Sequence, residues 1–217
     1  PGDTIPSFLY FSPSNGYTTI YAENLAGRNK RAVVQGERSE QFESFHFFES
    51  RMDVHPSGVA AFSSKYSERD ALFFWDLARG KVIARYQFPE LVSILSPAWA
   101  PDGRSVIFSG LSISGYSDLY RLWLADPLDS TAVGIDAGKG RLERLTSDRY
   151  EDLDPTISPD GRTVVFASDR TPYGPDGAHN LFALDLASGA IRYLTFGDWR
   201  DESPRWGGDH GDRIYFS

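Results

Sequence analysis

Short apolar runs separated by turn residues recur along the whole chain, and this pattern predicts β-strands rather than helices. Val164-Val165-Phe166 is a representative run, because its β-branched and aromatic residues favour a strand and it is too short for a buried helix. Before it, Pro159-Asp160-Gly161 has the residues of a tight turn: proline presets φ, aspartate bonds nearby amides and glycine accepts a positive φ. The stretch 154–168, DPTISPDGRTVVFAS, is therefore predicted to be a hairpin of two short strands.

This hairpin recurs three more times, which makes it the unit of an internal repeat. Residues 96–110 (SPAWAPDGRSVIFSG) align with it without a gap. Residues 203–217 (SPRWGGDHGDRIYFS) also align, with Gly208 in place of the turn proline. Residues 51–64 (RMDVHPSGVAAFSS) form a copy that is one residue shorter. The repetition indicates an architecture built from similar sheets.

A second hairpin follows each complete copy. In the clearest example, residues 181–186 are a predicted strand, Ala187-Ser188-Gly189 is a turn and residues 191–195 are the returning strand. Two hairpins give four antiparallel strands per repeat of about 45 to 60 residues, which is typical of a β-propeller blade. A single blade cannot bury both of its faces, so successive blades are expected to stack around an axis. The predicted fold class is all-β, a β-propeller of four-stranded antiparallel blades.

We expect one propeller domain over residues 1–217, containing about four blade periods. The predicted divisions are the end of one blade at 1–39, three blades at 40–89, 90–148 and 149–198, and the start of another at 199–217. The strands at 7–12 and 213–217 occupy the same place in the repeat, so a ring closed from these residues alone would contain that strand twice. The chain is therefore expected to be part of a ring of about six to eight blades.

Composition narrows the classes of function. The formal net charge is −8, and basic residues are dispersed except around Arg28, Lys30 and Arg31, which argues against a nucleic-acid partner. The absence of cysteine excludes disulfides, thiolate metal sites and a cysteine nucleophile. No apolar run approaches the ~18 residues that a membrane-spanning helix needs. The tryptophans lie near the repeat positions and are interpreted as core residues: Trp75, Trp99, Trp123, Trp199 and Trp206.

The loops after the second and fourth strands of each blade are expected on one face of the propeller, and binding residues usually lie on such loops. These loops bring acidic and aromatic side chains together in a predicted binding face for a protein or peptide partner, with a basic peptide or a cation as specific alternatives. The structural alternative is that the carboxylates cap turns and hydrate the surface. The predicted binding residues are Tyr116, Asp152, Asp154, Tyr173, Asp201 and Glu202.

No catalytic residue is predicted. The segment 110–114, GLSIS, is the nearest match to a GxSxG elbow, but it lacks the last glycine and lies in a loop. The histidines are scattered over different blades and are not spaced as zinc ligands. Asp152 with Asp154, and Asp209 with Asp212, offer oxygen ligands for calcium, but neither pair belongs to a DxDxDG loop. No cofactor is predicted, and calcium stays open as an alternative.

The repeated signature Ser/Asp-Pro…Pro-Asp-Gly-Arg, with Phe-Ala-Ser-Asp-Arg at 166–170, resembles the Pro-Asp-Gly repeats of TolB-type, WD-like β-propellers. The resemblance covers nearly the whole chain, although Pro56-Ser57-Gly58 and Gly208-Asp209-His210 depart from the turn signature. It implies a non-catalytic module for protein binding or scaffolding, in the periplasm or cell envelope. It leaves open the substrate-gating propeller of a prolyl-oligopeptidase-like or tricorn-like serine peptidase, whose catalytic domain would lie outside these residues. A related propeller lyase would need clustered channel histidines, which this sequence does not show.

Overall fold

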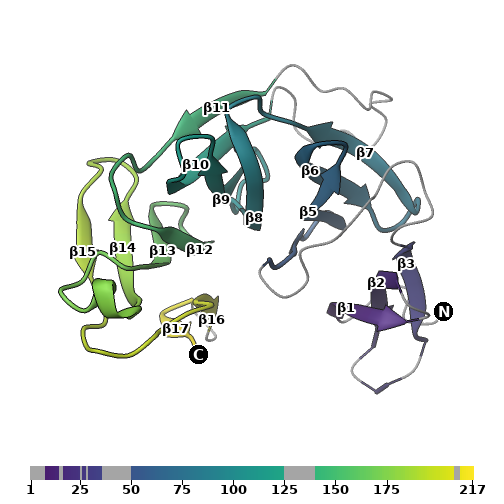
Figure 1. Cartoon of the computed structure of the whole chain (residues 1–217). Helices are drawn as coiled ribbons and strands as arrows, with labels where there is room; N and C mark the ends of the chain where they lie inside the picture. Colours follow the sequence, from purple (N-terminus) through teal and green to yellow (C-terminus); the bar gives the residue numbers. More distant parts are fainter. Residues whose placement is uncertain are drawn as a thin grey trace.

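The computed structural model describes residues 8–14, 17–24, 26–27, 29–35, 50–124, 140–207 and 211–217. Its main elements are β-strands, and no α-helix occurs in these ranges. Three four-stranded antiparallel sheets form the body of the chain, with neighbouring strands in the order in which they follow in the sequence (Figure 1). This confirms the predicted all-β class and the four-stranded antiparallel blades.

The strands of these three sheets have the following bounds. The first sheet contains β4 (Asp53–His55), β5 (Val59–Tyr66), β6 (Arg69–Asp76) and β7 (Lys81–Tyr86). The second contains β8 (Leu91–Trp99), β9 (Ser105–Ser112), β10 (Ser117–Trp123) and β11 (Arg141–Arg144). The third contains β12 (Asp152–Ile157), β13 (Thr163–Ser168), β14 (Asn180–Asp185) and β15 (Ile191–Tyr193).

Two smaller sheets flank the three full ones. The N-terminal sheet contains β1 (Phe8–Ser14), β2 (Tyr17–Glu23) and β3 (Arg31–Gln35). The C-terminal pair contains β16 (Arg205–Gly207) and β17 (Arg213–Tyr215). A short 3-10 turn, η1 (Gly174–Asp176), lies between β13 and β14. Within the described residues, no helix has the length and apolar character to cross a membrane.

The sheets follow one another along an arc, and apolar clusters fill the interfaces between them (Figure 1). Phe74 of β6 is fully buried, and its ring lies 5.1 Å from the ring of Trp99 at the end of β8. At the next interface, Phe166 and Phe182 pack into one cluster with Leu119 of β10. Full burial of such a side chain contributes about 1.5–3 kcal/mol, so these contacts hold successive sheets together.

The Pro-Asp-Gly turns have the backbone that their residues predict. Gly103 and Gly161 have positive φ angles of 67° and 72°. In the second turn, Asp160 Oδ1 accepts hydrogen bonds from Ser158 Oγ at 2.5 Å and from the backbone N of Arg162 at 3.0 Å. The hydrogen bond from Ser158 lowers the pKa of the Asp160 carboxyl. The turn is therefore closed by its own side chains, as in an Asx-turn.

The residue before the first proline of the repeat has a left-handed backbone in three copies. Ser96, Asp154 and Ser203 have φ angles of 50°, 54° and 55°, and the strand pairing shifts register across Ser96 and Asp154. This conformation is uncommon for residues other than glycine, and a residue before proline locally favours an extended backbone. The local sequence therefore gives no signal for these bulges, and contacts between sheets must stabilise them.

Candidate functional site

The predicted binding residue Asp154 lies in β12, where its carboxylate joins three sheets. Its Oδ1 accepts a hydrogen bond of 2.6 Å from Ser96 Oγ of β8. Its Oδ2 accepts hydrogen bonds from the backbone N and the Oγ of Ser203, at 3.1 and 3.2 Å. These are the same three residues that have left-handed backbones, so the repeated bulge brings their side chains together.

Arg51 reaches the same group of side chains from the segment before β4. Its Nη2 lies 3.4 Å from Asp154 Oδ1, and its Nη1 donates a hydrogen bond of 3.3 Å to the carbonyl oxygen of Pro204. Burial lowers the pKa of Arg51 to about 10, although Asp154 opposes this shift. The guanidinium is therefore still charged at neutral pH. Its contact with Asp154 stabilises both this charge and the junction of the three sheets.

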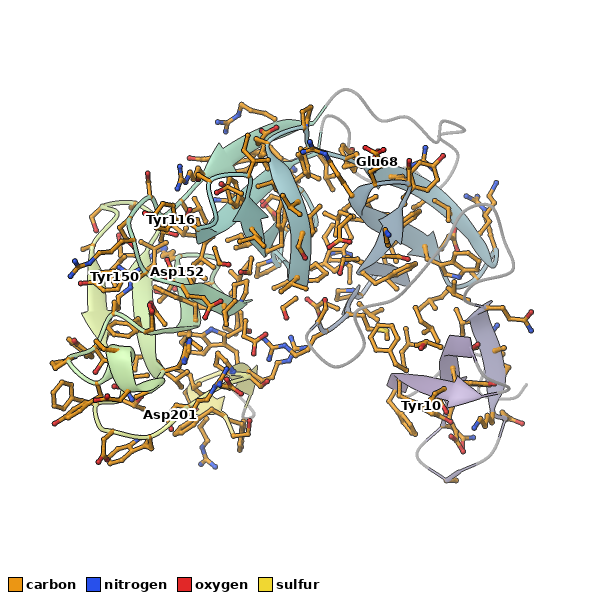
Figure 2. The ribbon with its side chains drawn as sticks, in the orientation of Figure 1. Tyr10, Glu68, Tyr116, Tyr150, Asp152 and Asp201 are labelled. Atoms are coloured by element: carbon orange, nitrogen blue, oxygen red, sulfur yellow. The ribbon has the colours of Figure 1, made fainter. Side chains whose placement is uncertain are left out.

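Asp152, a second predicted binding residue, is fully buried at the start of β12 (Figure 2). Arg170 Nη2 donates hydrogen bonds of 2.6 Å to both oxygens of its carboxylate, and Arg170 Nη1 donates one of 3.0 Å to Asp148. Burial by itself would lower the pKa of Arg170, but Asp152 and Asp148 raise it above its usual value. Asp152 is thus half of an internal ion pair rather than a surface carboxylate.

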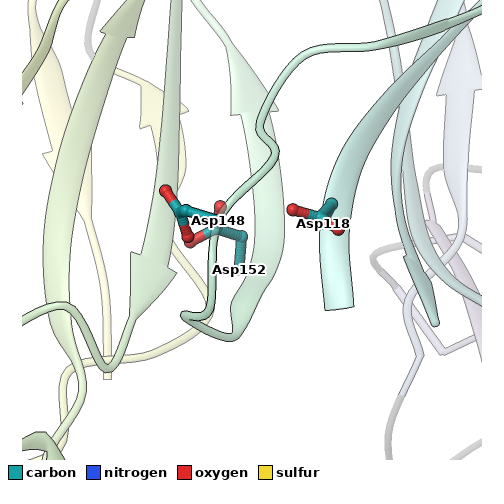
Figure 3. A group of neighbouring side chains, drawn as sticks. All are labelled: Asp118, Asp148 and Asp152. Atoms are coloured by element: carbon teal, nitrogen blue, oxygen red, sulfur yellow. The ribbon is translucent and has the colours of Figure 1, made fainter. Parts of the chain in front are cut away.

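Asp118, Asp148 and Asp152 form an acidic group whose carboxylate oxygens lie within 4.8 Å of one another (Figure 3). Two guanidinium groups offset two of its three formal negative charges. Arg144 Nη2 pairs with Asp118, and Arg170 pairs with the other two carboxylates. These arginines supply the positive charge that buried carboxylates require, so the group is an ion-pair network between the second and third full sheets.

The carboxylates considered as calcium ligands belong to different groups. Asp152 lies with Asp118 and Asp148, whereas Asp154 lies with Ser96 and Ser203. In the other pair, Asp209 lies outside the described residues. The structure therefore does not place the side chains of the first pair in one ligand set.

Asp201 and Glu202 lie in the connection between β15 and β16. The backbone N of Asp201 donates a hydrogen bond of 2.8 Å to the carbonyl oxygen of His179, and Asp201 Oδ2 accepts one of 3.0 Å from Trp199 Nε1. Glu202 Oε1 accepts a hydrogen bond from Arg200 Nε. Both predicted acids thus have partners within the chain. Trp199, interpreted from the sequence as a core residue, is 54% exposed because this loop places its ring outside the sheet interfaces.

His179 and Glu151 form a further contact across the loop face. His179 is buried immediately before β14, and its Nε2 lies 3.2 Å from Glu151 Oε2. The hydrogen bond with Glu151 raises the pKa of His179, and the same bond lowers the pKa of Glu151. A protonated His179 therefore ties the loop before β14 to the segment that leads into β12.

Exposed aromatic residues gather beside these ion pairs. Tyr173, Tyr193 and Phe196 are 36%, 45% and 53% exposed, respectively. The Phe196 ring lies 5.7 Å from the ring of Tyr173 and 5.4 Å from that of Tyr193, in edge-to-face arrangements. We call these three residues the aromatic cluster. Tyr173 was predicted as a binding residue, whereas the other two were not.

Tyr116, the remaining predicted residue, is 45% exposed in the loop between β9 and β10. Figure 2 shows Tyr116 well apart from Asp201. The six predicted residues therefore do not form one cluster. Two are exposed aromatics in different loops, and the four acids belong to separate internal contacts.

An open pocket of about 610 Å³ lies next to the aromatic cluster, and Tyr193 belongs to both. We call it the Tyr150–Tyr193 pocket. The Tyr150 ring has the guanidinium groups of Arg149 and Arg170 each 5.3 Å from its centroid, and the Tyr193 hydroxyl donates a hydrogen bond of 2.9 Å to the backbone oxygen of Arg170. The pocket is lined by Arg149, Tyr150, Asp169, Arg170, Thr171, Pro172, Gly174, Pro175 and Tyr193.

The sequence contained part of the signal for this pocket. The segment 170–179, RTPYGPDGAH, extends the loop between two predicted strands, and long loops on a rigid scaffold often bind ligands. Tyr193 had no such signal, because it lies in the last strand of a blade and its repeat equivalents are not aromatic in every copy. Only the packing of β15 beside the 170–179 loop identifies it.

No family model matches the chain. The Bacillus subtilis (strain 168) protein named uncharacterized peptidase YuxL is 28% identical over 131 residues, which are 59% of this chain and 18% of YuxL. The Tol-Pal system protein TolB of Francisella tularensis subsp. holarctica (strain OSU18) is 26% identical over 102 residues, which are 47% of this chain and 20% of that TolB. The chain thus spans about a fifth of the length of these curated relatives.

The crystal structure of TolB from Acinetobacter baumannii has a similar fold. It matches with a TM-score of 0.66 and 22% sequence identity, and the match covers 100% of this chain and 48% of that TolB. The similarity extends over every sheet of the described chain.

Proposed function

We propose that this chain, a TolB-type β-propeller, is a non-catalytic module that binds a protein partner through the face formed by the loops after the second and fourth strands of its blades. The aromatic cluster of Tyr173, Tyr193 and Phe196 is the observation that carries the proposal. Aromatic side chains are enriched at protein interfaces, and contiguous exposed apolar surface marks interaction sites. Cluster and pocket together offer apolar area on a rigid support.

Contacts with neighbouring residues hold the side chains of the aromatic cluster in place. Tyr193 packs with its ring 4.5 Å from the buried ring of Phe182, and its hydroxyl bonds the backbone of Arg170. Arg170 is in turn held by Asp152 and Asp148. A surface whose side chains are already fixed loses less conformational entropy when a partner binds, which favours a binding role.

Three sets of paired groups on this face favour binding over catalysis. Asp152 is paired with Arg170, Glu151 with His179, and Asp201 accepts the indole N–H of Trp199. A general acid or base must reach a substrate proton, and in the described residues these groups face one another instead. The proposal therefore assigns contact and recognition, not proton transfer, to the loop face.

The partner is proposed to be a protein or peptide with basic residues near its contact surface. The formal net charge of −8 favours such a partner through long-range attraction, and Asp176 and Asp198 are exposed in the loops of this face. The similarity to a Tol-Pal system protein supports a location in the periplasm or cell envelope.

The second candidate is a propeller that gates a serine peptidase. Its specific support is the similarity to the peptidase YuxL over 131 residues. The two candidates differ in the full-length protein, because only a peptidase would contain a hydrolase domain with a GxSxG nucleophile. Labelling of the purified full-length protein by a fluorophosphonate probe would support the peptidase. An unlabelled protein, with trypsin labelled in parallel, would support the binding module.

Site-specific photocrosslinking in the native cells tests the binding face. A photoreactive phenylalanine analogue at Tyr173 of the full-length protein is expected to give a discrete protein adduct after irradiation. The matched control position is Ala187, which is exposed in the turn between β14 and β15 on the opposite face. An adduct at Ala187 alone, or at neither position, would show that the loop face is not the binding surface.

A further inference from the structure

We propose that the Tyr150–Tyr193 pocket binds an extended, proline-rich segment of the partner, an inference that rests on the binding role proposed for the loop face. Such segments adopt the polyproline II conformation, which has no internal hydrogen bonds and presents its carbonyl oxygens outward. They are recognised by aromatic-lined grooves that also supply hydrogen-bond donors. The pocket has both features.

Two tyrosines supply the aromatic surface. The guanidinium groups of Arg149 and Arg170 each lie 5.3 Å from the centroid of the Tyr150 ring. Tyr193 is 45% exposed, and its ring is supported by Phe182 beneath it and Phe196 beside it. Proline rings pack well on such surfaces because they are apolar and rigid, so their burial costs little side-chain entropy.

Three acceptors around the pocket already have donors. Asp169 Oδ1 accepts a hydrogen bond of 2.7 Å from the backbone N of Glu151, and the Asp169 carbonyl oxygen accepts one of 2.7 Å from the backbone N of Thr171. The Arg170 carbonyl oxygen accepts the Tyr193 hydroxyl proton. A ligand rich in N–H donors would therefore compete with these internal donors.

A charged donor, by contrast, remains available. The Arg149 side chain is exposed, and its contact with the Tyr150 hydroxyl is long, at 3.5 Å. Thr171 also lines the pocket, but its Oγ1 is itself buried, so the donor that a ligand can reach is the Arg149 guanidinium. A proline residue offers a carbonyl acceptor to Arg149 and has no N–H of its own.

The pocket is also formed before binding. Arg170 is fixed by ion pairs to Asp148 and Asp152, and it positions both tyrosines through its guanidinium and its backbone oxygen. Pro172 and Pro175 restrict the backbone of the loop that forms the remaining wall. A stiff ligand meeting a stiff pocket loses little entropy on association, which matches a polyproline II segment.

Fluorescence anisotropy with a labelled decaproline peptide tests the inference on the full-length protein. Saturable binding is expected, and a Gly-Ser peptide of equal length should not bind. Tyr193→Thr, which removes the ring but suits a strand, is expected to weaken decaproline binding by at least about tenfold. Arg149→Ala is expected to weaken it about three- to tenfold, and it keeps the test informative if the Tyr193 variant is poorly folded.

Matched controls are Tyr215→Thr, an exposed strand tyrosine in β17, and Arg162→Ala, an exposed arginine in the turn on the opposite face. Both are expected to bind decaproline as the unsubstituted protein does. Absence of decaproline binding, with a photocrosslinked partner still formed at Tyr173, would overturn this inference and leave the proposed function intact. Decaproline binding that neither pocket variant weakens would overturn the assignment to this pocket. Absence of the photocrosslinked adduct at Tyr173 in the unsubstituted pocket background would instead reject the proposed function.

Discussion

Arg170 Nη2 lies 2.6 Å from both oxygens of the fully buried Asp152 carboxylate. Removing one member of a buried ion pair leaves the other charge without a partner, which costs about 3–5 kcal/mol. We therefore expect Arg170→Met to lower the free energy of unfolding by about that amount, as measured by urea denaturation.

Two further variants identify the cause of that loss. Asp152→Asn combined with Arg170→Met removes both charges, so the double variant should be more stable than the sum of the single effects predicts. Arg162→Met, at an exposed arginine, should change stability by less than about 0.5 kcal/mol. Strict additivity of the two buried substitutions would contradict the ion pair.

Asp154 gives a second prediction, because it joins three sheets and neutralises Arg51. Asp154→Ala removes the acceptor of Ser96 and Ser203 and leaves the guanidinium of Arg51, whose side chain is only 19% exposed, without its carboxylate partner. The expected loss is about 3–5 kcal/mol. Arg51→Met in the same chain should recover part of it, and a denaturant series on the single and double variants measures this. An Asp154→Ala protein as stable as the original would show that the shared carboxylate has no structural role.

The contact of His179 with Glu151 predicts a stability maximum in mildly acidic solution. The hydrogen bond with Glu151 raises the pKa of His179 above its usual 6.5, although burial and Arg200 oppose it. Its contribution is therefore complete below pH 6.5 and is lost as the pH rises through the higher, folded-state pKa. The pKa of Glu151 is lowered from 4.5, so its contribution is present above that pH and is lost as the pH falls through the folded-state pKa.

Urea midpoints at about pH 5.5 and about pH 8 measure this effect. We expect the lower pH to give the higher stability, by less than about 1 kcal/mol since Glu151 is half exposed to solvent. His179→Gln is the control, and it should remove most of the difference between the two pH values. A difference that persists in this variant would mean that another group titrates.

The two Pro-Asp-Gly turns provide a matched pair of glycine substitutions. Gly161→Ala places a side chain at a φ of 72° in open surroundings, where the nearest atom to the new Cβ would be 3.8 Å away. The left-handed backbone alone costs about 1–2 kcal/mol. Gly103→Ala has a similar φ, but its Cβ would lie 2.8 Å from Nε2 of His55 in the preceding blade. Thermal denaturation should therefore show a larger loss for Gly103→Ala, and equal losses would contradict this contact between blades.

Much of the fold could be predicted because its signals are local. A turn such as Pro159-Asp160-Gly161 and a run such as Val164-Val165-Phe166 determine their own conformation, and repetition shows that the same unit recurs. The proposed binding residues were harder to predict. Tyr173 lies in a long loop that the sequence indicates, but Tyr193 and Phe196 join it only through the packing of β15 against that loop.

The sequence by itself determined the strands, their turns and their antiparallel order, since each of these depends on residues close together in the chain. The tertiary structure alone decided which carboxylates face solvent. Asp152 and Asp154 would share one face of a regular strand, because side chains alternate with a period of two. The left-handed bulge at Asp154 breaks that alternation and sends the two carboxylates to different partners, Arg170 for one and Ser96 with Ser203 for the other. Those partners lie on other strands and loops, so the energy that stabilises the bulge is not encoded in the local sequence.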